Sequence, residues 1–134
     1  MKGILVVSHG TFAKGIVDTA RYIVGENLSQ LSYCCYEKED DPESFHKKIV
    51  SAFDEVDKGD GVIILLDLAT GRCLKEAAFL LNEKVEIMAG VNVPLLLEVL
   101  TGRMSGDVPG TGSLIEKGQR GLIDVRKYLA DTLN

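Results

Sequence analysis

Near its start the chain reads Lys2-Gly3-Ile4-Leu5-Val6-Val7-Ser8-His9-Gly10-Thr11-Phe12. Residues 4–7 form a short apolar run, which is typical of a strand buried on both faces of a parallel sheet. Apolar residues at helical spacing follow from Phe12 onward, so this stretch predicts a strand that leads into a helix. His9 lies at the junction, and α/β sheets place their chemistry at the carboxyl ends of strands. A histidine there offers a nucleophile or base near neutral pH.

The same alternation of strand and helix continues along the chain. Further strands are predicted over Leu31–Tyr36, 62–67 and Val85–Ala89, and helices over 12–24, 42–56, 72–82, from 94 onward and over 115–129. Strand–helix pairs in series imply parallel strands with right-handed crossovers. We therefore predict a single domain over 1–134, of α/β class. Its fold is flavodoxin-like: a doubly wound, mainly parallel sheet of about four strands in the order 2-1-3-4, with helices on both faces.

In this strand order the switch point lies between the first and third strands. The first strand ends at His9 and the third ends at Asp67, so the two side chains are expected to meet in one crevice. A carboxylate that accepts a hydrogen bond from one ring nitrogen fixes the tautomer of a histidine and leaves the other nitrogen free to attack. His9 and Asp67 are therefore the candidate catalytic residues.

Two turns border the predicted crevice. Gly10 and Thr11 open the first helix, whose backbone N–H groups suit an oxyanion or phosphate. Gly71 permits close backbone approach at the start of the third helix, and Arg72 offers a forked donor for phosphate. These four residues are the candidate phosphate-binding residues. No glycine-rich nucleotide motif appears in the sequence, so nothing predicts a nucleotide cofactor.

Composition narrows the class of function. The 134 residues carry a net charge of −5, no Trp and only 6% aromatic residues, which argues against nucleic-acid binding. The three cysteines form an odd set without metal-ligand spacing, so the sequence predicts neither a disulfide nor a metal site. The start of the chain does not resemble a signal peptide. We expect a cytoplasmic protein without a cofactor.

Each candidate residue also has an ordinary structural interpretation. His9 alone could be a structural loop residue, Asp67 a capping residue, and Arg72 a solvent-facing side chain. Cys73 lies near a helix N-terminus, where a thiolate can be stabilised. A cysteine-dependent enzyme with His9 as its base therefore remains an alternative, although a buried helix residue is the commoner case. The second histidine, His46, is expected on a helix surface.

The sequence resembles a known family, the EIIA domain of the mannose-type (mannose/fructose/sorbose) sugar phosphotransferase system. Three features carry the resemblance: the strand that ends in Ser8-His9-Gly10, the strand that ends at Asp67, and the run Ala89-Gly90-Val91-Asn92-Val93-Pro94-Leu95-Leu96-Leu97-Glu98. A Gly-Val-Asn-(Val/Ile)-Pro turn at the last position is characteristic of the family.

The resemblance implies that His9 accepts a phosphoryl group from the phosphocarrier HPr and passes it to a histidine of an EIIB component during sugar uptake. The membrane components EIIC and EIID are then only indirect partners. It also implies a homodimer completed by a C-terminal strand exchanged between subunits. Two related functions remain open: a phosphoryl relay for dihydroxyacetone kinase, and a regulatory domain that is phosphorylated as a signal.

The loop after Asp67 departs from the family pattern. The family follows its aspartate with a Gly-Gly-Ser-Pro-like loop, whose serine helps to hold the phosphate. Here the corresponding stretch is Thr70-Gly71-Arg72-Cys73. Arg72 takes the place of the serine and Cys73 that of the proline, so the phosphate contacts of this loop differ from those of the family. The segment after Arg103 also matches the family poorly.

Overall fold

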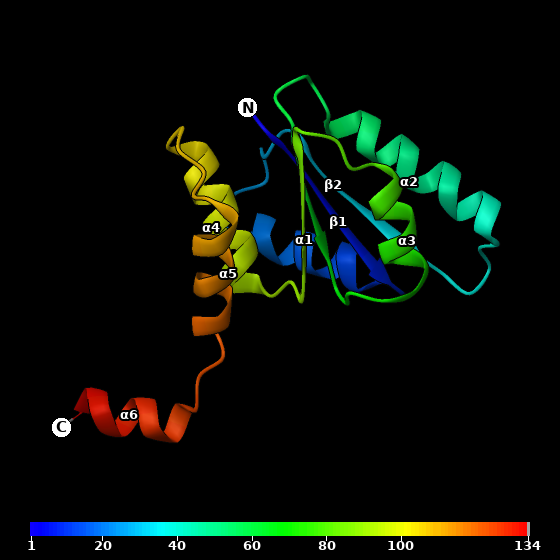
Figure 1. Ribbon diagram of the computed structural model, residues 1–134. Helices are drawn as coiled ribbons and strands as arrows, with labels where there is room; N and C mark the ends of the chain where they lie inside the picture. Colours follow the sequence, from blue (N-terminus) through cyan, green and yellow to red (C-terminus); the bar gives the residue numbers. More distant parts are fainter. Residues whose placement is uncertain (134) are drawn as a thin grey trace.

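The computed structural model describes residues 1–133. Its centre is a sheet of four parallel strands: β1 (Gly3–His9), β2 (Leu31–Tyr36), β3 (Val62–Leu66) and β4 (Val85–Ala89). Their order is β2-β1-β3-β4 (Figure 1). The predicted class and strand order are confirmed. Since β1 has β2 on one side and β3 on the other, the switch point lies between β1 and β3, as the sequence predicts.

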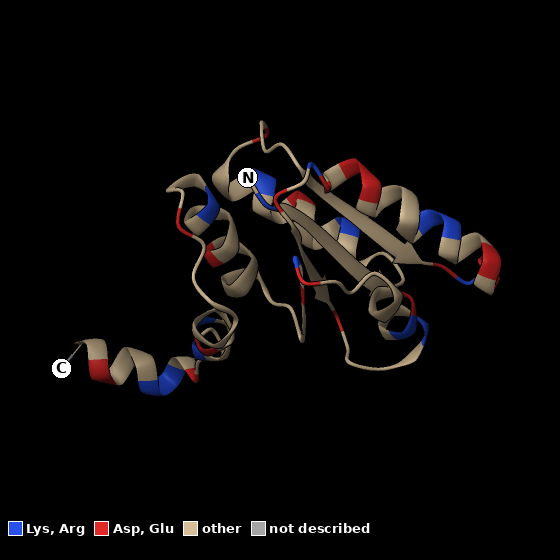
Figure 2. Cartoon of the chain, turned by 45° about the horizontal axis from the view of Figure 1, so that its top comes forward, with Lys and Arg blue, Asp and Glu red and all other residues tan. Residues whose placement is uncertain are grey.

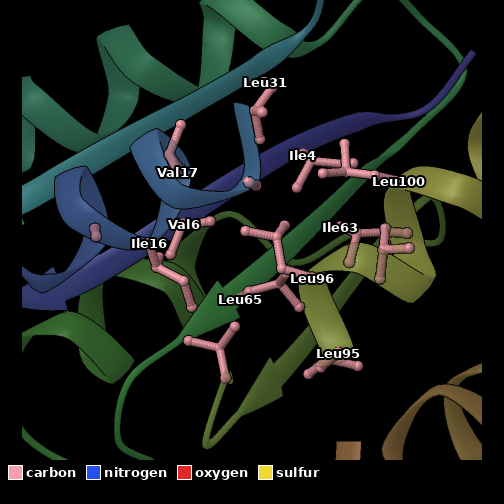
Figure 3. Packing of buried hydrophobic residues seen from close by; sticks show 14 of the residues in the cluster. Ile4, Val6, Ile16, Val17, Leu31, Ile63, Leu65, Leu95, Leu96 and Leu100 are labelled. Atoms are coloured by element: carbon pink, nitrogen blue, oxygen red, sulfur yellow. The ribbon is translucent and has the colours of Figure 1, made fainter. Parts of the chain in front are cut away.

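Helices cover both faces of the sheet. The two layers are α1 (Phe12–Val24) with α4 (Val93–Met104), and α2 (Pro42–Val56) with α3 (Gly71–Phe79). Successive β1 residues face opposite layers: Ile4 and Val6 belong to the core under α1 and α4, while Leu5 and Val7 belong to the core under α2 and α3. Figure 3 shows the first of these cores, with Leu96 and Leu100 of α4 packed over Ile63 and Ile4 of the strands. The uninterrupted apolar strands follow from this two-sided burial.

Two helix starts confirm the sequence pattern. The Asp41 carboxylate accepts a hydrogen bond from the Ser44 N–H, and the Ser44 hydroxyl accepts one from the Asp41 N–H, so α2 begins with a capping box. The Asn92 side chain caps α4 by accepting from the Leu95 N–H, and its amide also donates to the Gly118 carbonyl at 2.7 Å. The Gly-Val-Asn-Val-Pro turn therefore caps α4 and also binds the helix over Thr111–Arg120, which contains Gly118.

The third helix is shorter than predicted. It ends at Phe79 rather than near residue 82. Leu81 lies beyond the last turn and is 55% exposed. Cys73 and Ala77 of α3 are fully buried against the sheet.

The C-terminal region differs most from prediction. Instead of one helix over 115–129 there are two, α5 (Thr111–Arg120) and α6 (Val125–Leu133). They separate after Gly121, which lies so close to the Pro94 ring that a Cβ would be 2.5 Å from Pro94 Cγ. Figure 1 shows α6 leading away from the body, and none of its residues is buried. Within the single chain, residues 111–133 form these two helices and no strand. Exchange of a C-terminal strand between subunits stays a prediction.

A buried arginine joins the end of α4 to the start of the sheet. The Arg103 guanidinium donates to the backbone carbonyls of Lys2, Ser29 and Gln30 at 2.7–3.0 Å. These carbonyls lie where β1 and β2 begin, at the end of the sheet opposite His9. Arg103 therefore supplies hydrogen-bond donors to backbone carbonyls at the amino edge of the sheet, where two strands begin.

Candidate functional site

His9 and Asp67 meet at the carboxyl edge of the sheet. His9 is the last residue of β1, and Asp67 follows the last residue of β3, with its N–H donating to the Val7 carbonyl of β1. The Asp67 Oδ2 atom lies 3.0 Å from the backbone nitrogen of His9 and 3.0 Å from its Nδ1. Asp67 Oδ1 accepts from the Leu68 N–H at 2.8 Å. The carboxylate is therefore held by backbone donors on both oxygens while it holds the ring.

This contact fixes the chemistry of the imidazole. An ionised carboxylate can only accept hydrogen bonds, so the contact requires the proton of a neutral ring to sit on Nδ1. Nε2 then keeps its lone pair. The side chain of His9 is 40% exposed and that of Asp67 only 16%, so the ring is accessible while its partner is covered. The arrangement provides a nucleophilic nitrogen on a partly exposed ring.

The turn after His9 is held by a hydrogen bond from the Gly10 N–H and by another to the Ser8 hydroxyl. Gly10 has φ of +61°, a conformation that favours glycine, and its N–H donates to the Tyr36 carbonyl of β2 at 2.8 Å. Thr11 occupies the cap position of α1 without a capping hydrogen bond from its side chain. The buried Ser8 hydroxyl performs that task, since it accepts from the Ala13 N–H at 2.7 Å.

The second loop brings backbone close to the ring. Gly71 has φ of +73°, and a Cβ at this position would lie 3.2 Å from His9 Nε2. The main chain of α3 therefore starts beside the free nitrogen of the imidazole. Arg72, the next residue, is partly buried in the first turn of α3. The ion pairs found among residues 1–133 do not include its guanidinium.

Cys73 lies beneath the imidazole. Its Sγ is 3.9 Å from His9 Nδ1, and the residue is fully buried. Burial, helped by the negative charge of Asp67, raises the pKa of the Cys73 thiol to about 12. The group is therefore a thiol near neutral pH, which argues against the cysteine-dependent enzyme that the sequence left open.

The surface beside His9 has two hollows. One, of about 380 Å³, runs from His9 and Gly10 along Tyr36 to Asp40. The other, of about 630 Å³, lies between α1 and the start of α4, where Phe12, Ile16 and Val91 make it largely apolar. Figure 2 shows acidic and basic residues interspersed along α2. The histidine itself lines the first hollow, where Glu37, Lys38 and Asp40 bring charges of both signs.

The sequence did not identify two residues of this site. Ser8 supplies the cap of α1, and the Tyr36 ring lies 6.2 Å from the His9 ring. Tyr36 ends β2, the strand next to β1, so the predicted strand order contains the signal that finds it. His46 lies on α2, away from the site, with its Nδ1 2.7 Å from Glu76 Oε2 and its side chain 54% exposed. Its predicted position on a helix surface agrees with the structure.

Fold and site together define a class: a flavodoxin-like α/β domain with an exposed, carboxylate-supported histidine at the switch point of its sheet. A family model described as EIIA-man, PTS system fructose IIA component, matches residues 3–116. The chain belongs to this family, the EIIA components of mannose/fructose-type phosphotransferase systems.

Known relatives agree with this assignment. The mannose-specific EIIAB component of the Escherichia coli phosphotransferase system is 27% identical over 125 residues, which cover 89% of this chain and 38% of that protein. The chain thus spans about two fifths of that relative. The fructose-specific EIIA component of Bacillus subtilis is 28% identical over 105 residues, 77% of this chain and 71% of that protein.

A solved structure is also similar. It is the IIA protein associated with the fucose utilization operon of Streptococcus pneumoniae, with 30% identity, a TM-score of 0.85 and coverage of 96% of both chains. Within residues 1–133, no helix combines the length and the apolar character needed to cross a bilayer.

Proposed function

We propose that this protein carries a phosphoryl group on Nε2 of His9, accepted from HPr and passed to an EIIB component during sugar uptake. The observation that carries the proposal is the contact between Asp67 Oδ2 and His9 Nδ1. It leaves Nε2 as the nitrogen with a free lone pair, on an exposed ring. Membership of the EIIA family supports the same chemistry.

The transfer needs no cofactor. The Nε2 lone pair attacks the phosphorus of phosphorylated HPr, the phosphorus–nitrogen bond of the donor histidine breaks, and its electron pair stays with HPr. Positive charge that develops on the His9 ring is stabilised by the Asp67 carboxylate. A histidine nitrogen of EIIB then attacks the same phosphorus, and the Nε2–P bond breaks. His9 returns to its neutral form, with its proton still on Nδ1.

The two turns at the site hold the phosphoryl oxygens in this proposal. Thr11 contributes its hydroxyl and backbone N–H, Gly71 brings the start of α3 next to Nε2, and Arg72 contributes its guanidinium. Gly10 acts mainly through its left-handed conformation, because its N–H already donates to Tyr36. Donors at the start of a helix, together with an arginine, suit a dianionic group.

The protein partners are proposed from the surface and the family. The apolar groove beside Phe12, which is 45% exposed, offers HPr and EIIB a surface next to His9. EIIC and EIID interact only through EIIB, and the site of action is the cytoplasm.

We also propose a homodimer in which a second copy covers the apolar stripe of α6, formed by Val125, Tyr128, Leu129 and Leu133, all exposed. Truncation after Asp124 should then lower the mass measured by sedimentation equilibrium from that of a dimer to that of a monomer.

The central test is transfer of radioactive phosphate from phosphorylated HPr. The full chain is expected to gain one acid-labile phosphate, which His9→Gln abolishes and His46→Gln leaves in place. The matched pair is informative because these are the two histidines of the chain, and both bond to a carboxylate. Labelling that survives His9→Gln would overturn the proposal.

The recipient is tested in a second step. Chase of the labelled protein with purified EIIB should move the phosphate to EIIB and leave this chain unlabelled. Transfer to dihydroxyacetone kinase components, with none to EIIB, would replace the sugar-uptake role by the kinase relay. Retention of the phosphate with both recipients would favour the regulatory domain.

A further inference from the structure

Three potential metal ligands converge at His9, although they are far apart in sequence. His9, Asp67 and Cys73 each offer one ligand atom, and these three atoms lie within 4.8 Å of one another. Nδ1 of His9 is 3.0 Å from Asp67 Oδ2 and 3.9 Å from Cys73 Sγ. The phosphoryl-transfer proposal uses the first of these contacts and leaves the thiol without a role.

These distances are close to those of a tetrahedral zinc site. Zinc binds thiolate sulfur at about 2.3 Å and imidazole nitrogen or carboxylate oxygen at about 2.0–2.2 Å, so neighbouring ligand atoms lie roughly 3.3–3.6 Å apart. The two separations from Nδ1 bracket that range. The three ligand atoms together lie within 4.8 Å, so seating an ion also draws the Asp67 carboxylate and the Cys73 sulfur toward each other. Nitrogen, oxygen and sulfur donors together suit a borderline-soft cation rather than magnesium or calcium. We propose that His9, Asp67 and Cys73 bind one zinc ion, with water as the fourth ligand.

Charge and access are consistent with such a site. A thiolate and a carboxylate together neutralise a divalent cation, and the imidazole remains neutral. Cys73 is buried while the His9 side chain is 40% exposed, so the ion enters from the His9 side and reaches the sulfur behind the ring. Binding displaces the thiol proton to solvent, since zinc deprotonates a thiol that it coordinates.

Zinc at this site would block phosphoryl transfer. Coordination uses the Nδ1 lone pair, so the proton of the neutral ring must move to Nε2. Nε2 then has no lone pair with which to attack phosphorus. This inhibition rests on the proposed function of His9, whereas zinc binding itself does not. The site would therefore act as a competitive metal switch on the phosphorylated residue.

Binding is tested on the full chain without any phosphoryl donor, with cobalt(II) as a spectroscopic substitute for zinc. One cobalt ion per chain should bind and give a thiolate-to-cobalt charge-transfer absorption. Cys73→Ser should abolish that absorption, and Cys34→Ser, which alters another buried cysteine, should retain it. In competition with a chromophoric chelator, Asp67→Asn and His9→Gln should each weaken zinc binding by about tenfold or more.

Several results would overturn the proposal. They are a wild-type chain that binds no cobalt, an absorption that persists in Cys73→Ser, or zinc affinity unchanged by His9→Gln. Circular dichroism checks that Cys73→Ser folds. If Cys73→Ser does not fold, the zinc affinity of His9→Gln is the deciding measurement, because the His9 side chain is partly exposed.

The inhibition is tested separately. The ratio of phosphate incorporation with and without zinc should fall at least tenfold in wild type and stay near one in Cys73→Ser. A ratio near one in a wild type that binds zinc would overturn the inhibition. Failure of wild type to incorporate phosphate without zinc would instead refute the proposed function and leave zinc binding standing.

Discussion

The two histidines of this chain make nearly the same contact in different surroundings. His9 Nδ1 lies 3.0 Å from Asp67, and His46 Nδ1 lies 2.7 Å from Glu76. In both pairs the histidine is accessible and the carboxylate is covered, with 16% of the Asp67 side chain and 7% of the Glu76 side chain exposed. A bond from histidine to carboxylate therefore does not by itself identify a reactive site.

The backbone around each pair makes the difference. The first pair lies at the carboxyl ends of β1 and β3, where Asp67 accepts from two backbone N–H groups and Gly71 approaches Nε2. The second pair joins the sides of α2 and α3, and the hollow next to it is lined by residues of α2 alone, His46, Lys47, Val50, Ser51 and Asp54. Helix sides have their N–H groups bonded internally, whereas strand ends and helix starts leave them free. We therefore expect a phosphoryl group to be held at the first pair and not at the second.

The largest difference between the pairs should appear when each carboxylate is neutralised. Asp67→Asn removes the charge that stabilises the ring and allows the amide N–H₂ to face Nδ1, which favours the wrong tautomer. The rate of phosphate uptake from HPr should fall about 10²–10⁴-fold, by analogy with the carboxylate of a catalytic triad. Glu76→Gln should leave the rate unchanged.

The nitrogen-15 chemical shifts of His9 report which ring nitrogen carries the proton. A purely structural role of Asp67 would leave these shifts unchanged. Wild type should show the proton on Nδ1, and Asp67→Asn should shift it toward Nε2. An unchanged tautomer together with a normal rate would show that Asp67 is not a positioning residue.

The next prediction concerns the Arg72 guanidinium, which is proposed to contact the phosphoryl group at the first pair. Charge-assisted hydrogen bonds are worth about 1.5–3 kcal/mol, so Arg72→Ala should slow phosphate uptake by roughly 10–100-fold. Lys75→Ala, one turn along α3 and exposed, is the matched control and should have little effect. Equal rates for both variants would place Arg72 outside the phosphate site.

Gly71 tests whether the close approach of backbone to Nε2 matters. Gly71→Ala introduces a Cβ at φ of +73° and 3.2 Å from Nε2, so the free energy of unfolding should fall by about 1–2 kcal/mol. The substitution also crowds the nitrogen that would carry phosphate. Gly112→Ala in α5, where a Cβ meets no atom within 4 Å, should instead be neutral or stabilising in urea denaturation. Similar losses of unfolding free energy in Gly71→Ala and Gly112→Ala would show that Gly71 has no special role.

Much of the fold could be predicted because the determining interactions are local or strictly periodic. The strand runs, the Asp41-Pro42 helix start and the alternation of elements predict about four parallel strands, for which the flavodoxin-like order 2-1-3-4 is expected. The C-terminal part could not be predicted in the same way. Residues 115–129 have helical periodicity, yet Gly121 is held against Pro94 and the chain turns there. Periodicity shows where an apolar face lies and not what it packs against.

The candidate site shows the same contrast between features that the sequence predicts and features that depend on packing. His9 and Asp67 could be paired because strand order brings their positions together. The role of Ser8 as the cap of α1, and the use of the Gly10 N–H by Tyr36, depend on turn geometry that residue order does not contain. The sequence indicates Cys73 as a possible nucleophile, whereas its burial next to the His9 ring depends on how α3 packs against the sheet.

The smallest effect is expected at the second pair, and it should be on stability alone. His46→Ala removes the partner of the buried Glu76 carboxylate, but water can enter where the exposed imidazole was. The free energy of unfolding should therefore fall by about 1 kcal/mol, with the phosphorylation rate unchanged. Urea denaturation measures the first and HPr-dependent labelling the second. A loss of phosphorylation without a loss of stability would mean that the α2–α3 contact positions the loop of Gly71 and Arg72, and the two pairs would then form one coupled site.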